Sequence, residues 1–133
     1  MAVNPELLKN ILFAFERSNS PETLLVAVAK EAKHAMQSKG EMYSHLQWLS
    51  DAGYIANHKG TKQTYTYVSF ADEYELCHYR WRLTPSGYAF LKELLSIPAW
   101  DEFKESLKGE SFEFLKQMLL KAVEKKLRQV MPE

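Results

Sequence analysis

The chain has 133 residues, 46% of them hydrophobic, and its 17 basic and 17 acidic side chains give a formal net charge of zero. This length and composition predict one compact domain and exclude a disordered polymer. Proteins that cover much DNA backbone usually carry a basic face, so with a net charge of zero any contact with nucleic acid has to be local. No run reaches the roughly 18 apolar residues of a membrane span, and Glu6 and Lys9 interrupt the apolar positions that a signal peptide would need. We therefore expect a cytoplasmic protein without a membrane partner.

Two helices are predicted in the first part of the chain. The Asn4-Pro5 pair is a typical helix start, and the first helix should run to about Arg17. The Ser20-Pro21 pair repeats the signal and predicts a second helix that ends near Ser38. Apolar residues recur at helical spacing in both, at Leu8, Ile11, Leu12 and Phe15 and at Leu25, Val28, Ala29, Ala32 and Met36.

A third helix is predicted between Gly40, which separates it from the second, and Gly53. It is the candidate recognition helix of a helix-turn-helix pair. Met42, Leu46 and Leu49 can face inward, while Tyr43, Ser44, Gln47, Trp48 and Asp51 would face outward.

The segment after the third helix has the alternation of a β-hairpin. β-Branched and aromatic residues predict a strand over residues 63–70. Residues 71–75 would connect it to the returning strand, and their acidic side chains would be repelled by phosphate. The returning strand should bury Cys77, Tyr79, Trp81 and Leu83 and expose His78, Arg80 and Arg82.

A fourth helix follows the hairpin. Thr84 is its predicted cap, Pro85 its first residue, and it ends before Pro98. Gly87 would allow a close approach of the helix to its neighbour. The apolar face would consist of Tyr88, Leu91, Leu94 and Leu95.

Two further helices are predicted at the C-terminal end. A short one around Trp100, Phe103 and Leu107 stops at Gly109, and Ser111 caps a long last helix. Its broad apolar stripe would either lie across the domain or pair with a symmetry mate. The candidate homodimer interface consists of Leu119, Val123 and Leu127.

This order of elements predicts an α+β, mostly helical fold: a winged helix-turn-helix with a β-hairpin wing and additional C-terminal helices. We expect a single domain over residues 1–133, with a core of 1–97 and a helical extension of 98–133.

Four segments, ILFAFE, SHLQWLSDAGYI, RLTPSGYAFL and PAWDEFKESLK, together resemble a bacterial and prophage-associated domain family of unknown function. The resemblance covers nearly the whole chain and is least in the second helix. It implies a winged-helix fold and brings no assigned activity. The chain departs from the family pattern at Trp48, Pro85 and Tyr88, where an aliphatic residue, an aromatic residue and histidine are more usual. The shared positions are Ile11, Leu12, Glu16, His45, Leu46, Leu49, Gly53, Ile55, Arg82, Leu83, Thr84, Gly87, Phe90, Leu91 and Trp100.

The third helix carries the side chains that could read a DNA groove. Ser44 and Gln47 could bond base edges, and Tyr43 or Trp48 could contact sugar or a thymine methyl group. Alternatively, Tyr43 and Trp48 pack against the second helix or a partner chain. His45 could bond a phosphate but is interpreted as a structural group beside the core.

Cations before and within the returning strand form the candidate phosphate-binding surface. The alternative is a solvated face that Asp72, Glu73 and Glu75 neutralise. The cations are His58, Lys59, Lys62, His78, Arg80 and Arg82.

The sequence has little that supports catalysis. Cys77 is expected to be buried rather than nucleophilic, and the histidines at 34, 45, 58 and 78 lack metal-ligand spacing. No paired-carboxylate motif or glycine-rich phosphate loop is present. We expect a protein that is not an enzyme, with no catalytic residue, metal or cofactor.

Two functions are compatible with these patterns. The first is a bacterial or prophage DNA-binding regulator of transcription, dimeric through its last helix and bound to double-stranded DNA. The second is a winged-helix module that binds a protein through Trp48, the tyrosine-rich hairpin and the last helix, without binding DNA.

Overall fold

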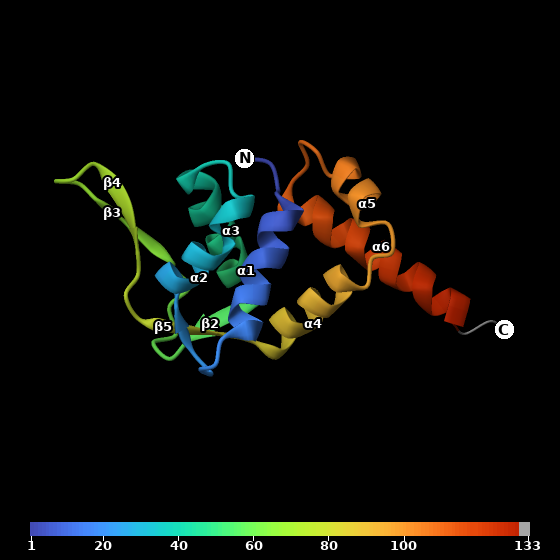
Figure 1. The fold of residues 1–133 in the computed structure, drawn as a ribbon, viewed down its shortest axis with the longest axis horizontal. Coiled ribbons are helices and arrows are strands. Elements are labelled where there is room, and N and C mark those ends of the chain that lie inside the picture. The colour runs from blue at the N-terminus through green and yellow to red at the C-terminus, as the bar shows by residue number, and fades with distance from the viewer. Residues whose placement is uncertain (131–133) are drawn as a thin grey trace.

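The computed structural model describes residues 1–130 and has an α+β fold, with six α-helices and two small antiparallel sheets in that range (Figure 1). The elements are α1 (Pro5–Arg17), β1 (Thr23–Leu24), α2 (Leu25–Ala32), the short 3-10 helix η1 (Lys33–Ala35), α3 (Lys39–Asp51), β2 (Ile55–Asn57), β3 (Tyr65–Val68), β4 (Glu73–Leu76), β5 (Arg80–Leu83), α4 (Pro85–Leu95), α5 (Trp100–Ser106) and α6 (Phe112–Val130).

Side-chain caps fix the helix starts that the sequence predicts. The amide of Leu7 donates to Oδ1 of Asn4 (3.1 Å) at the start of α1. The amide of Gly87 donates to Oγ1 of Thr84 (3.0 Å) at the start of α4. The amide of Phe114 donates to Oγ of Ser111 (3.1 Å) just before α6. The predicted starts of these three helices are therefore confirmed.

The second helix begins later and ends earlier than predicted. Thr23 and Leu24 form β1, because they pair with Trp81 and Arg80 of β5 and so cannot be helical. Ser38 caps α3 by accepting a hydrogen bond from the amide of Glu41 (3.2 Å). Gly40 thus lies inside α3 and does not separate the two helices.

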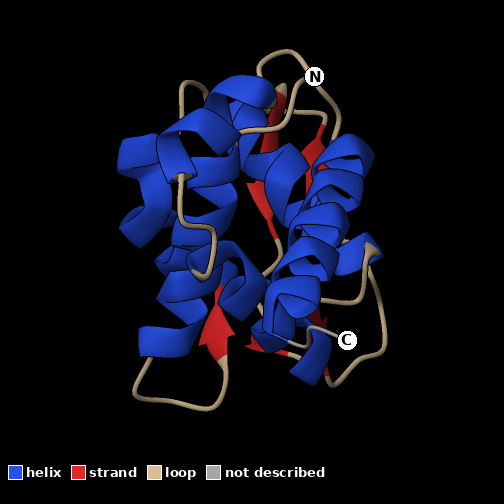
Figure 2. Cartoon of the chain, turned by 90° about the vertical axis from the view of Figure 1, so that its right-hand side faces the viewer, coloured by secondary structure: helices blue, strands red, loops and turns tan. Residues whose placement is uncertain are grey.

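The predicted hairpin is in fact split between the two sheets, which lie at separate places on the molecule (Figures 1 and 2). Residues 65–68 and 73–76 pair as β3 and β4, so most of the predicted acidic connection is strand. We call this two-stranded element, residues 65–76, the ribbon. β5 instead pairs with β1 and β2, in the order β1–β5–β2.

Burial of a tryptophan explains the split. Trp81 is completely buried in the body of the protein, whereas Arg80 and Arg82 beside it are exposed, as the alternation predicts. Burying this large side chain holds β5 against the helices. The ribbon is closed at its base by a hydrogen bond from the amide of Cys77 to the carbonyl of Thr64 (2.9 Å) and projects from the body (Figure 1).

The core is built around α1, which contacts α2, α3 and α4. α4 presents Phe90, Leu91 and Leu94 to this core, while Tyr88 and Leu95 are each 43% exposed, so the predicted apolar face of α4 is wrong at these two positions. Gly87 is also buried on this face, and it lies so close to the chain after α3 that an added Cβ would be 2.0 Å from the carbonyl oxygen of Tyr54.

The last two helices share the same core. Phe103 and Leu107 at α5, and Leu115 and Leu119 of α6, belong to the buried cluster that surrounds α1. Leu119 is 2% exposed, so its predicted place in a dimer interface is wrong. Val123 is half-buried and Leu127 is 55% exposed.

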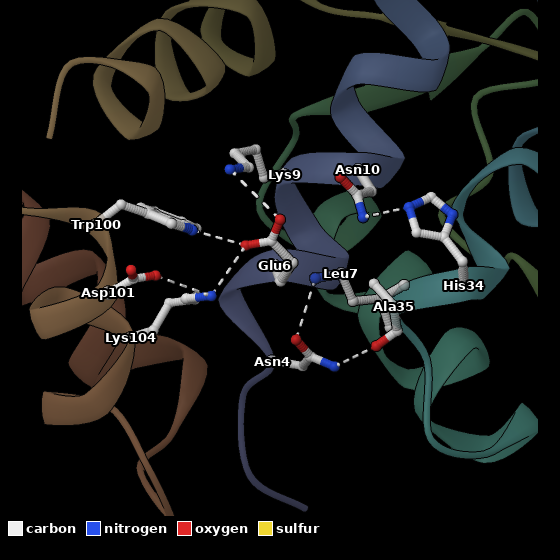
Figure 3. A network of polar contacts seen from close by, with 10 residues as sticks. All are labelled: Asn4, Glu6, Leu7, Lys9, Asn10, His34, Ala35, Trp100, Asp101 and Lys104. Carbon is white, nitrogen blue, oxygen red and sulfur yellow. Dashed lines mark hydrogen bonds and ion pairs between the residues drawn. The ribbon is translucent and has the colours of Figure 1, made fainter.

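A polar network ties α5 to α1 (Figure 3). Nε1 of Trp100 donates to the carboxylate of Glu6 (2.6 Å), and Lys9 and Lys104 lie 3.5 and 3.6 Å from the same carboxylate. Partial burial raises the pKa of Glu6, but the bond from Trp100 and the two lysine charges outweigh burial, so this pKa lies below its usual value.

Candidate interaction surfaces

The outward face of α3 is largely covered by other parts of the chain. The hydroxyl of Tyr43 donates to the backbone carbonyl of Tyr74 (2.9 Å) in the ribbon. The Tyr43 ring centroid lies 5.5 Å from that of Tyr65 and 5.9 Å from that of Tyr74. This side chain therefore connects α3 to the ribbon.

The side-chain amide of Gln47 uses all of its hydrogen-bonding capacity within the chain. Its Nε2 donates to Oδ1 of Asp51 (2.9 Å) and to the carbonyl of Lys62 (3.0 Å). Its Oε1 accepts from the amide (3.0 Å) and the hydroxyl (2.8 Å) of buried Thr64. Since a primary amide has two donor hydrogens and two acceptor lone pairs, no capacity is left for a base edge. Gln47 is an anchor for the loop before the ribbon, a role that sequence reasoning missed.

Trp48 packs within its own chain, but against α6 and not against the second helix or a partner chain, which the alternative interpretation named. Its ring is half-buried, stacks on Phe112 of α6 with centroids 5.9 Å apart, and lies 4.6 Å from the ring of His45. Ser44 donates to the carbonyl of Gly40 in its own helix (2.9 Å). Of the four groove-reading candidates on α3, only Ser44 is thus unconnected to another part of the fold.

His45 is a structural group, in agreement with its interpretation from the sequence. It is completely buried, Nε2 accepts a hydrogen bond from the amide of Asn4 (2.8 Å), and Nδ1 lies 2.7 Å from the carbonyl oxygen of Glu41. Burial is the main cause that lowers the pKa of His45 below its usual value, although the carbonyl and charge of Glu41 act in the opposite direction.

The strand arginines lie on the exposed face of the three-stranded sheet. Within residues 1–130, neither Arg80, Arg82, Lys59 nor Lys62 forms an ion pair with a carboxylate. A backbone carbonyl, that of Glu22, is 3.4 Å from Nη1 of Arg80. These cations therefore keep a net positive charge at the surface.

The acidic residues expected to neutralise these arginines lie on the ribbon instead. Glu75 pairs with His78 (2.9 Å), so His78 alone among the strand cations has a partner from this set. Asp72 accepts a hydrogen bond from the hydroxyl of Tyr67. His58, in the loop before the ribbon, pairs with Glu22 (2.9 Å).

The ribbon has two different faces. Cross-strand pairing places Tyr65 opposite Leu76 and Tyr67 opposite Tyr74, which makes one face aromatic. Tyr67 and Tyr74 are 52% and 51% exposed. The turn at the tip presents Phe70, which is 94% exposed. The predicted strand over residues 63–70 is therefore wrong at Phe70, whose position before Ala71-Asp72 is compatible with a turn.

A groove lies at the base of the ribbon, between α2 and α3. Its volume is about 370 Å³. Val26, Ala29, Met36, Met42 and Leu76 supply apolar surface, and Lys30, Lys33 and Lys39 also line it. We call it the lysine groove. A second cavity of about 430 Å³, beside α6, is lined by Ile97, Pro98 and Val123 among others.

Among residues 1–130, no three His, Cys, Asp or Glu side chains are grouped so as to hold a metal. Cys77 is half-buried, and its Sγ accepts a hydrogen bond from Nε1 of Trp81 (3.0 Å). No helix in this range is long and apolar enough to span a membrane.

Comparison of the chain with protein-family models, with curated proteins and with solved structures gave no match. The family resemblance drawn from the sequence therefore stays a prediction.

Proposed function

We propose that the chain is a winged-helix protein that works as a protein interaction module, with the ribbon as its contact element. The order α1, β1, α2, α3, β2 and β5, with β5 between β1 and β2, is compatible with a winged helix. The ribbon is an insertion between the two strands of its wing.

The occupied face of α3 is the observation that carries this proposal. To bond a base edge, Gln47 would have to lose its hydrogen bonds to Thr64 and Lys62. The hydroxyl of Tyr43 already donates a hydrogen bond to a backbone carbonyl of the ribbon. The ribbon that covers α3 is acidic, so it would repel the phosphates that flank a groove. Both features oppose insertion of α3 into DNA.

The ribbon has the composition of a protein-binding surface. Exposed aromatic side chains are the commonest anchors of protein interfaces, because they bury a large area with few rotatable bonds. Phe70, Tyr67 and Tyr74 supply three of them. In the described residues β3 and β4 pair only with each other, so each also offers a free edge for an added strand.

Site-specific photo-cross-linking in cells tests this function. A photoreactive phenylalanine analogue at position 70 should give covalent adducts with protein, whereas the same analogue at position 120, on α6, should give few. Leu120 is a matched control because it is also exposed, at 60%. Equal or absent adducts at both positions would refute the ribbon as the contact element.

A second candidate is binding to the backbone of double-stranded DNA, as expected of a transcription regulator. The absence of carboxylate partners for Arg80 and Arg82 within residues 1–130 favours it. The double variant Arg80→Ala, Arg82→Ala should weaken binding to a random duplex and reduce the slope of log K against log salt by about 2, since each phosphate contact contributes about 0.9. A Lys125→Ala, Lys126→Ala variant is the control, and equal slopes in all three proteins would exclude this surface.

A further inference from the structure

The lysine groove combines apolar surface with a concentration of positive charge. Val26 is 58% exposed although it is aliphatic, and half-buried Met36 lines the same groove, whose floor includes buried Met42. Methionine side chains adapt to different apolar partners. In the described residues Lys30, Lys33 and Lys39 form no ion pair, so their charge is available to an acidic occupant.

The ribbon of the same chain has the complementary chemistry. Its residues 65–76 include Asp72, Glu73 and Glu75 and contain no lysine or arginine. Phe70 stands almost fully exposed at the tip, next to the first two of these acids. A large apolar side chain beside carboxylates is the kind of ligand that an apolar groove with three lysines would bind. It cannot reach its own groove, because that groove lies at the base of the same ribbon.

We propose that the lysine groove receives the ribbon tip of a second copy of the chain, so that two copies form a closed, two-fold symmetric dimer. This rests on the proposed function, in which the ribbon is the contact element. Leu76 belongs both to the ribbon base and to the groove. Two ribbons aligned antiparallel about a two-fold axis therefore bring each tip to the other's groove, and both contacts form at once.

The dimensions of the ribbon fit this arrangement. β4 runs from Glu73 to Leu76, about 10 Å of extended strand at about 3.3 Å per residue, and the turn of residues 69–72 carries Phe70 beyond the end of that strand. The two-fold axis would pass near the middle of this length, close to Tyr74. The half-exposed rings of Tyr67 and Tyr74 would then meet their counterparts across the axis and become buried.

Sedimentation equilibrium on the full chain tests the dimer, with charge reversal on each side of the contact. The groove variant Lys30→Glu, Lys33→Glu and the ribbon variant Glu73→Lys, Glu75→Lys should each raise the dimer dissociation constant at least tenfold. All four lysine and glutamate positions are exposed, so the fold should tolerate the changes. Combining the four substitutions in one chain restores charge complementarity and should recover most of the lost association. Lys125→Glu, Lys126→Glu on α6 should have no effect.

Each alternative result has a defined meaning. A wild-type chain that stays monomeric at all concentrations, or charge-reversal variants that dimerise as well as the wild type, would overturn the second copy as occupant. In that case adducts from position 70 to a different protein would still support the proposed function, whereas equal or absent adducts at positions 70 and 120 would refute both. Adducts from position 70 to α2 or α3 of another copy support both proposals.

Discussion

The backbone amide of Asn4 donates a hydrogen bond to Nε2 of His45, 41 positions later in the chain, over 2.8 Å. On the other side of the ring, Nδ1 lies 2.7 Å from the carbonyl oxygen of Glu41, which can only accept. Nδ1 must therefore carry the proton, and Nε2 must be unprotonated. The fold thus requires the neutral imidazole in one tautomer, and this ring joins the start of α1 to α3.

Acid should destabilise the protein in the range where histidine titrates. Because the pKa of His45 is lowered in the folded state, the unfolded chain takes up a proton first as pH falls below about 6.5, the ordinary value for histidine. Above that pH, His45 is neutral in both the folded and the unfolded state. It then contributes nothing to the pH dependence of the free energy of unfolding. Urea unfolding between pH 8 and pH 5 should show stability falling below about pH 6.5.

Two variants separate His45 from the other histidines. His45→Gln should lose this dependence on pH, and it should also lower stability by about 1–3 kcal/mol because a buried partner is lost. His34→Gln should keep the dependence, since His34 is exposed. If the wild type and His45→Gln have the same slope between pH 7 and pH 5, the fold does not hold His45 in the neutral form and the lowered pKa is wrong.

Replacing Trp100 should weaken the attachment of α5. Trp100→Phe keeps an aromatic ring and removes the donor to Glu6, at a cost of about 1–2 kcal/mol for a partly exposed bond to a charged group. The folded pKa of Glu6 is lowered, so this stabilisation is present above the carboxyl group's unfolded pKa and is lost as pH falls through the folded one.

Urea denaturation at pH 7 and pH 3 measures this effect. The difference between wild type and Trp100→Phe should be smaller at the lower pH. Glu113→Gln is a suitable comparison, because Glu113 forms only a surface pair with Lys116 (3.0 Å), and it should change stability by less than about 1 kcal/mol. An equal difference between wild type and Trp100→Phe at both pH values would contradict the role assigned to Glu6.

Local signals made several features of the fold predictable. Asn4, Thr84 and Ser111 act through hydrogen bonds to amides three residues away, so their sequence neighbours are sufficient to identify them. The alternation around Trp81 likewise follows from strand geometry. The residues that cover the buried face of β5 come from distant segments, but the alternation that defines this face is a local property of the sequence.

Pairing between distant segments could not be read from the sequence. β5 leaves the predicted hairpin to pair with Thr23 and Leu24, more than 50 residues earlier. The sequence predicts a free polar side chain at Gln47, because its partners Lys62 and Thr64 lie 15 and 17 positions away. The sequence pattern around a polar residue on a helix surface is the same whether its hydrogen-bond partners are water molecules or a distant loop.

Gly87→Ala should be strongly destabilising. An alanine Cβ would lie 2.0 Å from the carbonyl oxygen of Tyr54, a backbone atom that cannot move without shifting β2 or α4. We expect a loss of about 3 kcal/mol or more, at the upper end of overpacking effects. Gly40→Ala is the matched change inside α3, where the nearest atom to the new Cβ is a methionine methyl at 3.8 Å. It should gain about 0.5–1 kcal/mol from helix propensity, and comparable thermal stabilities for the two variants would refute the close approach.

Gln47→Ala tests whether this side chain is an anchor or a reader of bases. As an anchor, its loss leaves the amide of buried Thr64 without a partner and should cost about 1–3 kcal/mol. Hydrogen exchange at Thr64 should become much faster, and limited proteolysis should cut between α3 and the ribbon. Ser44→Ala removes only a bond within α3 and should leave both readouts unchanged. A Gln47→Ala protein with normal stability and exchange, but an altered preference among duplex sequences, would return α3 to the role of recognition helix, because the amide would then have to be free to leave the loop and bond base edges.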